Sequence, residues 1–193
     1  MATAMISCNG NNQNSIFPAG CELRTGDIVF RRGGGISSHA VMMADINGRY
    51  SHVGIVVDSA GKKMIVHAVP GEPDFEGDPD RVKMDTPEKF FSVTNANAGE
   101  VKRLRGDTLT PIKAAAFAME IYCRYTLFDH DYDDSDTTKM YCCEIVEFAY
   151  AKAGRSLAGT VRHDIKLPGL NAFHCMLPSD ICNSKLLISI IDF

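Results

Sequence analysis

Hydrophobic positions near residue 145 follow the period of an α-helix. Apolar side chains recur there at three- and four-residue steps, at Cys142, Ile145, Val146, Ala149 and Ala153. Thr137 and Thr138 lie just upstream as caps, and Gly154 is a suitable C-terminal stop. We therefore predict a helix that packs one face on a core and carries Cys142 in its first turn.

Two β-rich runs earlier in the chain predict a β-hairpin. They span residues 51–57 and 64–69, and the link 58–63 has the composition of a turn. An even-numbered loop centred on 59–60 or on 60–61 would place His52 and His67 on one face, within reach of a shared partner. An odd loop would place them on opposite faces.

The remaining pattern predicts alternating elements within one domain. Strands are expected at 25–31, 100–105 and 186–191, and helices at 38–45 and from Thr110-Pro111 to Tyr122. Loops are expected at 31–38, 70–87 and 168–178, of which 70–87 is long enough to border a site. We find no repeat or linker, so we predict a flexible tail over 1–20 and one domain over 21–193.

Composition narrows the class of partner. The chain has 193 residues, 45% hydrophobic and 23% charged, as expected for an ordinary globular domain. Its net charge of -4 gives no basic footprint for nucleic acid. No apolar run approaches the roughly 20 residues of a membrane span.

Cysteine usage and an acidic run bear on metal binding. Seven cysteines are an odd number, so at least one thiol is free within the chain, and no repeated C-x-x-C spacing indicates zinc. The acidic run 129–136 fails the calcium-loop pattern, because Asp134 stands where Gly is needed and Met140 where Glu is needed. We expect a solvated loop there and no metal.

The segment before Cys8 resembles the last residues of a bacterial lipoprotein signal. Met5-Ile-Ser-Cys8 fits that pattern, but the charged and apolar regions expected before it are missing. Either Cys8 is the lipidation site of a shortened signal, or it is an ordinary residue of the tail.

The predicted elements bring together the parts of a thiol enzyme. A thiol at a helix start is favoured as thiolate by the helix dipole and the free backbone N–H groups. A cysteine nucleophile also needs a base, and that base needs a third group to orient it. His52 and His67, packed against the amino end of the Cys142 helix, would supply both. The alternative is a set of buried structural residues.

Three segments resemble the signatures of the YiiX/YebB-like permuted papain-fold proteins, which are related to NlpC-type cell-wall peptidases and lecithin:retinol acyltransferase-like enzymes. The segments are 24–30, 50–57 and 141–150, and the resemblance spans roughly 23–188. It implies an α+β, circularly permuted papain-like (NlpC-type) fold, with an antiparallel sheet packed against the Cys-bearing helix. The His hairpin precedes the Cys helix, which is the order of the permuted group.

The resemblance also implies roles for individual residues. His52 matches the family's base and Cys142 its nucleophile, with Cys143 as the second choice. His67 stands where the YiiX-like proteins often carry Glu, and it would orient His52. Glu72 is the fallback for that orienting role.

The implied function is that of a cysteine-dependent amidase or peptidase acting through an acyl-enzyme. Its substrate would be a bacterial cell-wall peptide or another small amino-acid amide, and no metal or organic cofactor is required. The resemblance and Cys8 suggest the bacterial cell envelope, periplasmic or lipid-anchored, with the cytoplasm as the alternative. Rival functions are an acyltransferase or lipid or ester hydrolase of the same fold, and a non-catalytic binding module.

Overall fold

A six-stranded antiparallel sheet organises the chain, whose computed structural model describes residues 14–166 and 172–193. The strand order is β10-β5-β1-β2-β3-β4, and each neighbouring pair is antiparallel. The strands are β1 (Ile28–Arg32), β2 (His52–Ser59), β3 (Lys62–Ala68), β4 (Val82–Asp85), β5 (Ala98–Leu104) and β10 (Leu187–Asp192).

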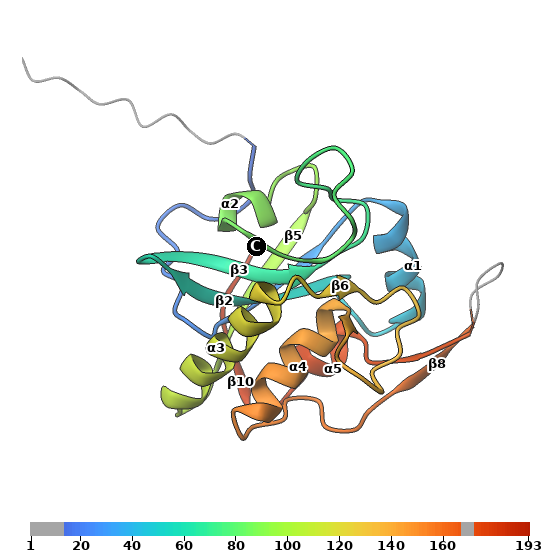
Figure 1. Cartoon of the computed structure of the whole chain (residues 1–193). Coiled ribbons are helices and arrows are strands. Elements are labelled where there is room, and N and C mark those ends of the chain that lie inside the picture. Colours follow the sequence, from blue (N-terminus) through green and yellow to red (C-terminus); the bar gives the residue numbers. More distant parts are fainter. Residues whose placement is uncertain (1–13, 167–171) are drawn as a thin grey trace, which may run out of the picture.

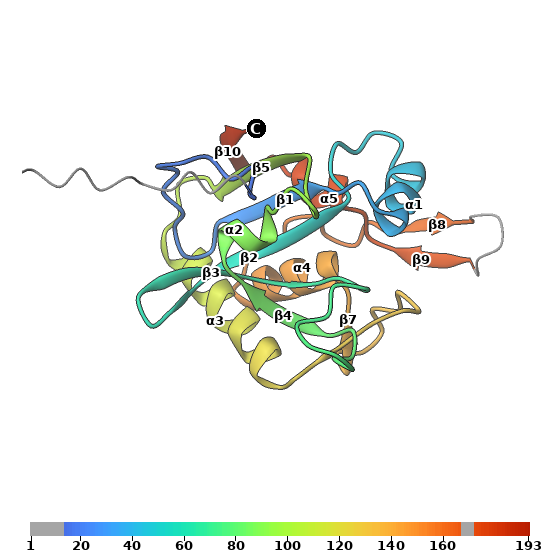
Figure 2. The ribbon, with the colours of Figure 1, turned by 90° about the horizontal axis from the view of Figure 1, so that it is seen from above.

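Helices and two small ribbons surround this sheet (Figures 1 and 2). The helices are α1 (Ile36–Ala44), α2 (Pro87–Phe90), α3 (Leu109–Cys123), α4 (Cys142–Lys152) and α5 (Pro178–Cys182). The ribbons pair β6 (Leu127–Phe128) with β7 (Lys139–Met140), and β8 (His163–Ile165) with β9 (Phe173–Cys175).

Strand alternation divides the interior into two cores. Side chains such as Ile55 and Val57 pack with α3 and α4 on one face of the sheet. Val56 and Ile65 pack with Phe90 of α2 on the other face. Figure 1 shows α3 and α4 on one side of the sheet and α2 on the opposite side. The sheet is therefore covered on both faces.

The end of the predicted tail belongs to the domain. The backbone N–H of Ile16 donates to the carbonyl of Phe91 over 2.9 Å. The Phe17 ring stacks on Phe91 with 5.5 Å between centroids. These contacts bury apolar surface, so the domain begins before residue 21, the boundary that the sequence predicted. Cys8 lies outside the described residues.

The hairpin adopts the second of the two even-loop registers. Ile55 of β2 faces Val66 of β3, so the turn is centred on Ala60 and Gly61. Both residues have positive φ, 52° and 79°, as a tight two-residue hairpin turn requires. His67 and His52 consequently share one face of the sheet, in diagonal positions.

The predicted loop 70–87 contains a strand that the sequence did not reveal. Within it, β4 pairs with β3 and places Lys83 opposite His67. Lys83 and Asp85 are buried on the α2 face, where a hydrophobic alternation would require apolar residues. Ion pairs satisfy these charges, so a buried strand has a polar sequence. The predicted loop 168–178 likewise contains β9, and residues 167–171 lie outside the description.

Other boundaries also differ from the expectations. Tyr141, not Thr137 or Thr138, occupies the N-cap position of α4, because β7 runs as far as Met140. Gly154 has φ +97° and follows the helix end, as predicted. The last strand, β10, forms an edge of the sheet beside β5.

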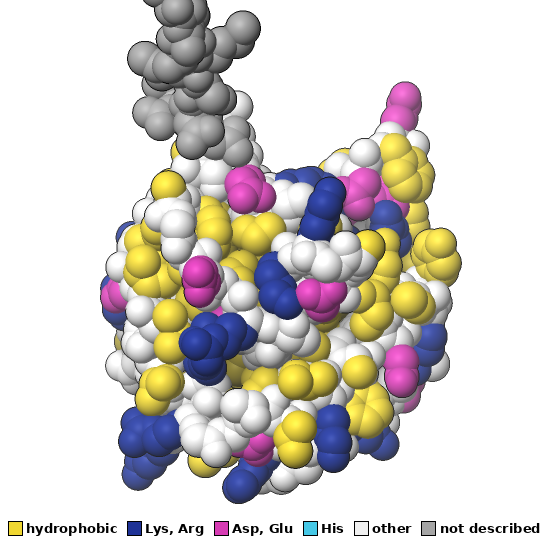
Figure 3. All heavy atoms as spheres, turned by 90° about the vertical axis from the view of Figure 1, so that its left-hand side faces the viewer, with side chains coloured by type: hydrophobic (Ala, Val, Ile, Leu, Met, Phe, Trp, Pro, Cys, Tyr) yellow, Lys and Arg dark blue, Asp and Glu magenta, His cyan; other side chains and the backbone are white. Residues whose placement is uncertain are grey.

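The face on the left of Figure 1 mixes apolar side chains with charges of both signs (Figure 3). Such mixing fits the small net charge of -4. Among the described residues, none of the helices has both the length and the apolar character needed to cross a bilayer.

Candidate active site

Cys142 is the first residue of α4. Tyr141 before it is extended, with φ −102° and ψ 173°, and its backbone N–H donates to the Glu144 carboxyl over 3.4 Å. The Cys142 side chain is half-buried at the positive end of the helix. The first N–H groups of a helix have no partner within it, so they can also receive an anion here.

Two buried imidazoles, those of His52 and His67, lie next to this thiol. His52 opens β2, His67 lies on β3, and His52 Nε2 is 2.9 Å from His67 Nδ1. Both rings pack against Phe90, with centroid distances of 5.6 and 5.0 Å. They therefore lie on the α2 face, whereas α4 covers the other face. Cys142 reaches His52 because His52 is the first residue of its strand.

Asp85 of β4 completes the chain of side chains. His67 Nε2 lies 3.1 Å from Asp85 Oδ2, and Lys89 Nζ lies 2.8 Å from Asp85 Oδ1. Burial alone would raise the pKa of Asp85. The hydrogen bond and charge of His67, the hydrogen bond of Lys89 and the charge of Lys83 together outweigh burial and hold that pKa well below its usual range. Asp85 is therefore a carboxylate.

An ionised Asp85 determines the tautomers of both histidines. A carboxylate only accepts hydrogen bonds, so His67 Nε2–H donates to it and His67 Nδ1 becomes an acceptor. His52 Nε2–H then donates to His67 Nδ1. The lone pair of His52 Nδ1 remains free to face the thiol, which is the arrangement a general base requires.

The environment of Cys142 favours the thiolate. Its sulfur lies 3.9 Å from that of Cys143. A hydrogen bond from Cys143, then the charge and hydrogen bond of His52 and the backbone N–H of Val53, outweigh burial and hold the pKa of Cys142 well below its usual range. Burial and the neighbouring Cys142 sulfur raise the pKa of Cys143 well above it. The two thiols thus differ in role, with Cys142 as the ionising group.

Burial raises the pKa of a thiol but lowers the pKa of an imidazole. Burial, helped by the charges of Arg31 and His67, outweighs the opposing pull of Cys142 and lowers the pKa of His52 to about 4. Burial also lowers the pKa of His67, against the opposing pull of Asp85. Burial thus favours the neutral rings while Cys142 keeps its proton, and the charge of an ionised Cys142 opposes burial and lets His52 accept that proton.

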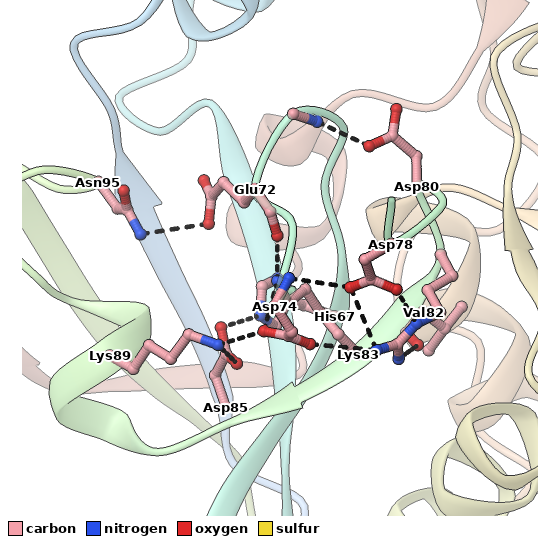
Figure 4. Close-up of polar contacts among 12 residues, drawn as sticks. His67, Glu72, Asp74, Asp78, Asp80, Val82, Lys83, Asp85, Lys89 and Asn95 are labelled. Carbon is pink, nitrogen blue, oxygen red and sulfur yellow. Dashed lines mark hydrogen bonds and ion pairs between the residues drawn. The ribbon is translucent and has the colours of Figure 1, made fainter. Parts of the chain in front are cut away.

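Glu72, the fallback orienter, lies elsewhere. Its Oε1 pairs with Arg31 over 2.5 Å and its Oε2 accepts from Asn95 over 3.2 Å. Figure 4 shows Glu72 within a network of charges that also contains Asp74, Lys83, Asp85 and Lys89. His67 is therefore the residue that contacts His52, and Glu72 helps to hold the loop after β3.

Two groups at this site, Asp85 and Arg31, were not predicted from the sequence. Asp85 was assigned to a loop, although Thr86-Pro87 directly after it is a helix-start signal that marks the end of an element. Arg31 was assigned to a strand end. The Arg31 side chain is buried and donates to the Phe90 carbonyl over 2.7 Å. Its guanidinium carbon lies 4.7 Å from the centre of the Phe90 ring. Only the strand pairing shows that both are next to the histidines.

Two cavities meet at Cys142. One, of about 410 Å³, is lined mainly by apolar side chains from α1 and from the segment before α5. The other, of about 350 Å³, has a mixed lining of the 33–35 glycines, polar side chains including His52, and apolar side chains such as Val69 and Phe128. The thiol is thus accessible from both sides.

Comparison with known proteins identifies the fold. No protein-family model matches the chain, and no curated protein matches it in sequence. Among solved structures, it is similar to the crystal structure of the metalloprotein YiiX (DUF1105) from Escherichia coli O157:H7. The TM-score is 0.68 at 19% identity, and the alignment covers 88% of this chain and 97% of YiiX. The chain has the YiiX fold.

The YiiX structure is that of a metalloprotein, and metal binding here would need a group of donor side chains. Within residues 14–166 and 172–193, no three His, Cys, Asp or Glu side chains are grouped to hold a metal ion. In the histidine pair, His52 Nε2 and His67 Nδ1 are engaged with each other. The described residues do not fit a metal centre.

Proposed function

We propose that this chain is a cysteine-dependent amide hydrolase, an amidase or peptidase that acts through an acyl-enzyme on Cys142. One observation carries the proposal: the continuous chain Cys142–His52–His67–Asp85, in which the terminal carboxylate orients the histidines. The permuted papain-like relationship belongs to the same proposal. The order of His hairpin before Cys helix supports it.

Acylation follows from the positions of these groups. The Cys142 proton passes to His52 Nδ1, and the sulfur attacks the amide carbonyl carbon. Backbone N–H groups at the start of α4 stabilise the oxyanion. The C–N bond then breaks, and the His52 imidazolium gives its proton to the departing amine. A thioester on Cys142 remains.

Deacylation uses the same base a second time. His52 takes a proton from water, and the hydroxide oxygen forms a bond to the thioester carbon. The C–S bond breaks, the carboxylic acid leaves, and the Cys142 sulfur recovers its proton from His52. Atoms balance with one water consumed per amide cleaved.

The proposal includes a substrate and a location. The substrate is a bacterial cell-wall peptide or another small amino-acid amide, and the location is the cell envelope. The resemblance to cell-wall peptidases and the lipoprotein-like residues before Cys8 support these parts. Neither requires nucleic acid, which the net charge of -4 disfavours as a partner.

One observation favours a second candidate, an acyltransferase or lipid or ester hydrolase with the same acyl-enzyme. The cavity beside Cys142 is lined mainly by apolar side chains, which suit an acyl chain. An acyltransferase differs in the second step, where an amine or alcohol replaces water, and offering the acylated enzyme both acceptors in competition detects it. An ester hydrolase differs in the first step, where an alcohol leaves in place of an amine, and comparing matched amide and ester substrates detects it.

A brief, substoichiometric iodoacetamide pulse tests the shared chemistry. Intact-mass spectrometry and peptide mapping locate the label in the native chain and in His52→Ala. The exposed Cys123 is an internal reference thiol. We expect Cys142 to be labelled preferentially and this preference to collapse in His52→Ala. Labelling of Cys142 no faster than Cys123, and indifferent to His52, would instead indicate a binding module.

A further inference from the structure

Three cysteines from two distant segments line the cavity of about 410 Å³ beside the active site. Cys142 and Cys143 open α4, and Cys175 is the last residue of β9. Cys142 is half-buried, whereas Cys143 and Cys175 are 1% and 6% exposed. Within residues 14–166 and 172–193, all three are free thiols. Of the three, Cys175 takes no part in the acyl-enzyme mechanism.

The segment that carries Cys175 is fixed against the start of α4. The backbone N–H of Met176 donates to the Tyr141 hydroxyl over 3.0 Å, and Tyr141 directly precedes Cys142. Burial and the charge of Cys142 raise the pKa of Cys175 to about 11. A protonated thiol from β9 is therefore held in the same cavity as the thiolate of α4.

Cys143 is a neighbour of Cys142 but is poorly placed to bond to it. Their sulfurs lie 3.9 Å apart. The Cα atoms of consecutive residues are about 3.8 Å apart, whereas the Cα atoms of a disulfide are usually about 4.4 to 6.8 Å apart. The Ile145 N–H donates to the Tyr141 carbonyl over 3.1 Å and holds both cysteines in the first helical turn. A bond between them would disrupt this turn, so Cys175 is the better partner.

We propose that this cavity is a peroxide-reactive site, at which hydrogen peroxide oxidises Cys142 and Cys175 then closes a reversible disulfide with it. The disulfide blocks the nucleophile and protects it from further oxidation. This inference goes beyond the proposed function, because it needs a reactive thiol at Cys142 but no amide substrate.

Both steps balance with peroxide as the oxidant. The Cys142 proton passes to His52, and the thiolate attacks one peroxide oxygen, so that an S–O bond forms and the O–O bond breaks. The departing hydroxide takes the proton from His52 and leaves as water. Cys175 Sγ then attacks the sulfenic sulfur, an S–S bond forms, and the hydroxyl leaves with the Cys175 proton as a second water. Two thiols are oxidised, and one peroxide is reduced to two waters.

Peroxide treatment of the full chain tests the site. Native chain, Cys175→Ala and Cys182→Ala receive an equimolar amount of hydrogen peroxide, iodoacetamide caps the remaining thiols, and non-reducing peptide mapping locates disulfides. Cys182→Ala is the matched control, because Cys182 is also buried but lies outside both cavities. We expect a Cys142–Cys175 disulfide in the native chain and in Cys182→Ala, and dithiothreitol should reverse it by thiol exchange.

Cys175→Ala removes the thiol that closes the disulfide. Its Cys142 should persist as a sulfenic acid that dimedone traps, and excess peroxide should carry it to a sulfinic acid that dithiothreitol does not reduce. The fraction of Cys142 that dithiothreitol returns to the alkylatable form should therefore fall several-fold. Cys175→Ser, which conserves the volume, should show the same loss, and thermal unfolding curves verify that each variant is folded.

The outcomes separate this inference from the proposed function. A disulfide from Cys142 to any other cysteine, or equal recovery of Cys142 in the native chain and in Cys175→Ala, would overturn the inference. Oxidation of Cys142 no faster than that of the exposed Cys123 would also overturn it. Rapid alkylation of Cys142 in the reduced chain would in each case leave the amide hydrolase standing, whereas slow alkylation there would overturn the proposed function itself.

Discussion

His52 Nε2 lies 2.9 Å from His67 Nδ1, and the two imidazoles come from adjacent strands of one hairpin. His67 can thereby hold His52 in the tautomer whose Nδ1 faces Cys142. We expect His67→Leu to slow alkylation of Cys142 by about tenfold or more. His67→Gln, whose amide oxygen can still accept from His52, should retain more of the rate. Equal rates for the two variants would contradict an orienting role.

Asp85 should matter through the same chain, although it does not touch the thiol. In Asp85→Asn the amide can donate to His67, so the tautomers are no longer determined and Cys142 should alkylate more slowly. The matched control is Asp58→Asn in the β2–β3 hairpin, at an exposed ion pair with Lys63. If Cys142 alkylates at the same rate in Asp85→Asn as in Asp58→Asn, Asp85 does not act on the thiol through the histidines.

Stability gives a second test of Asp85. Its folded pKa is depressed, so its stabilisation is present above the unfolded value of 3.8 and is lost as pH falls through the folded pKa. Asp85→Asn should lower the free energy of unfolding by about 1–3 kcal/mol at neutral pH and make it less sensitive to acid. Denaturant unfolding at several pH values measures both effects.

Cys143 should tune the nucleophile rather than replace it. Its hydrogen bond is the largest influence that lowers the pKa of Cys142. We expect Cys143→Ala to move the pH profile of Cys142 alkylation to higher pH. Cys143→Ser keeps a donor at that position and should shift the profile less. An unchanged profile in Cys143→Ala would show that the helix and His52 suffice.

Glu144 should make the fold sensitive to alkali. Burial raises the pKa of this carboxyl to about 8 from the usual 4.5. The folded state then binds more protons than the unfolded state between these values, so stability falls as pH rises through that range. In Glu144→Gln, a neutral isostere, the free energy of unfolding should fall by a few kcal/mol less between pH 5 and pH 9 than it does in the native chain. Glu120→Gln on the exposed side of α3 is the control, and an identical loss in both variants would contradict the prediction.

The hairpin turn offers a stabilising substitution. Ala60 has φ 52°, a left-handed conformation that Asn tolerates better than Ala. Ala60→Asn should raise the free energy of unfolding by about 0.5–1 kcal/mol. Gly61→Ala, at φ 79°, should lower it by about 1 kcal/mol, and chemical denaturation of both variants measures the pair.

The sequence by itself determined the local elements that carry the site. Helical spacing placed Cys142 at the start of α4, and the turn residues between 58 and 63 predicted a hairpin whose even-loop registers put His52 and His67 on one face, as the observed register does. These predictions succeed because hydrophobic periodicity and turn chemistry act over a few neighbouring residues.

Only the tertiary structure decided how these elements meet. Asp85 reaches His67 through a strand whose inward charges are balanced by ion pairs, so no apolar alternation marks it. The histidines lie on the sheet face opposite α4, and the thiol meets them at the strand end. The two cavities combine residues from α1, β2 and the segment before α5. Such contacts depend on the pairing of distant segments, which local sequence patterns do not encode.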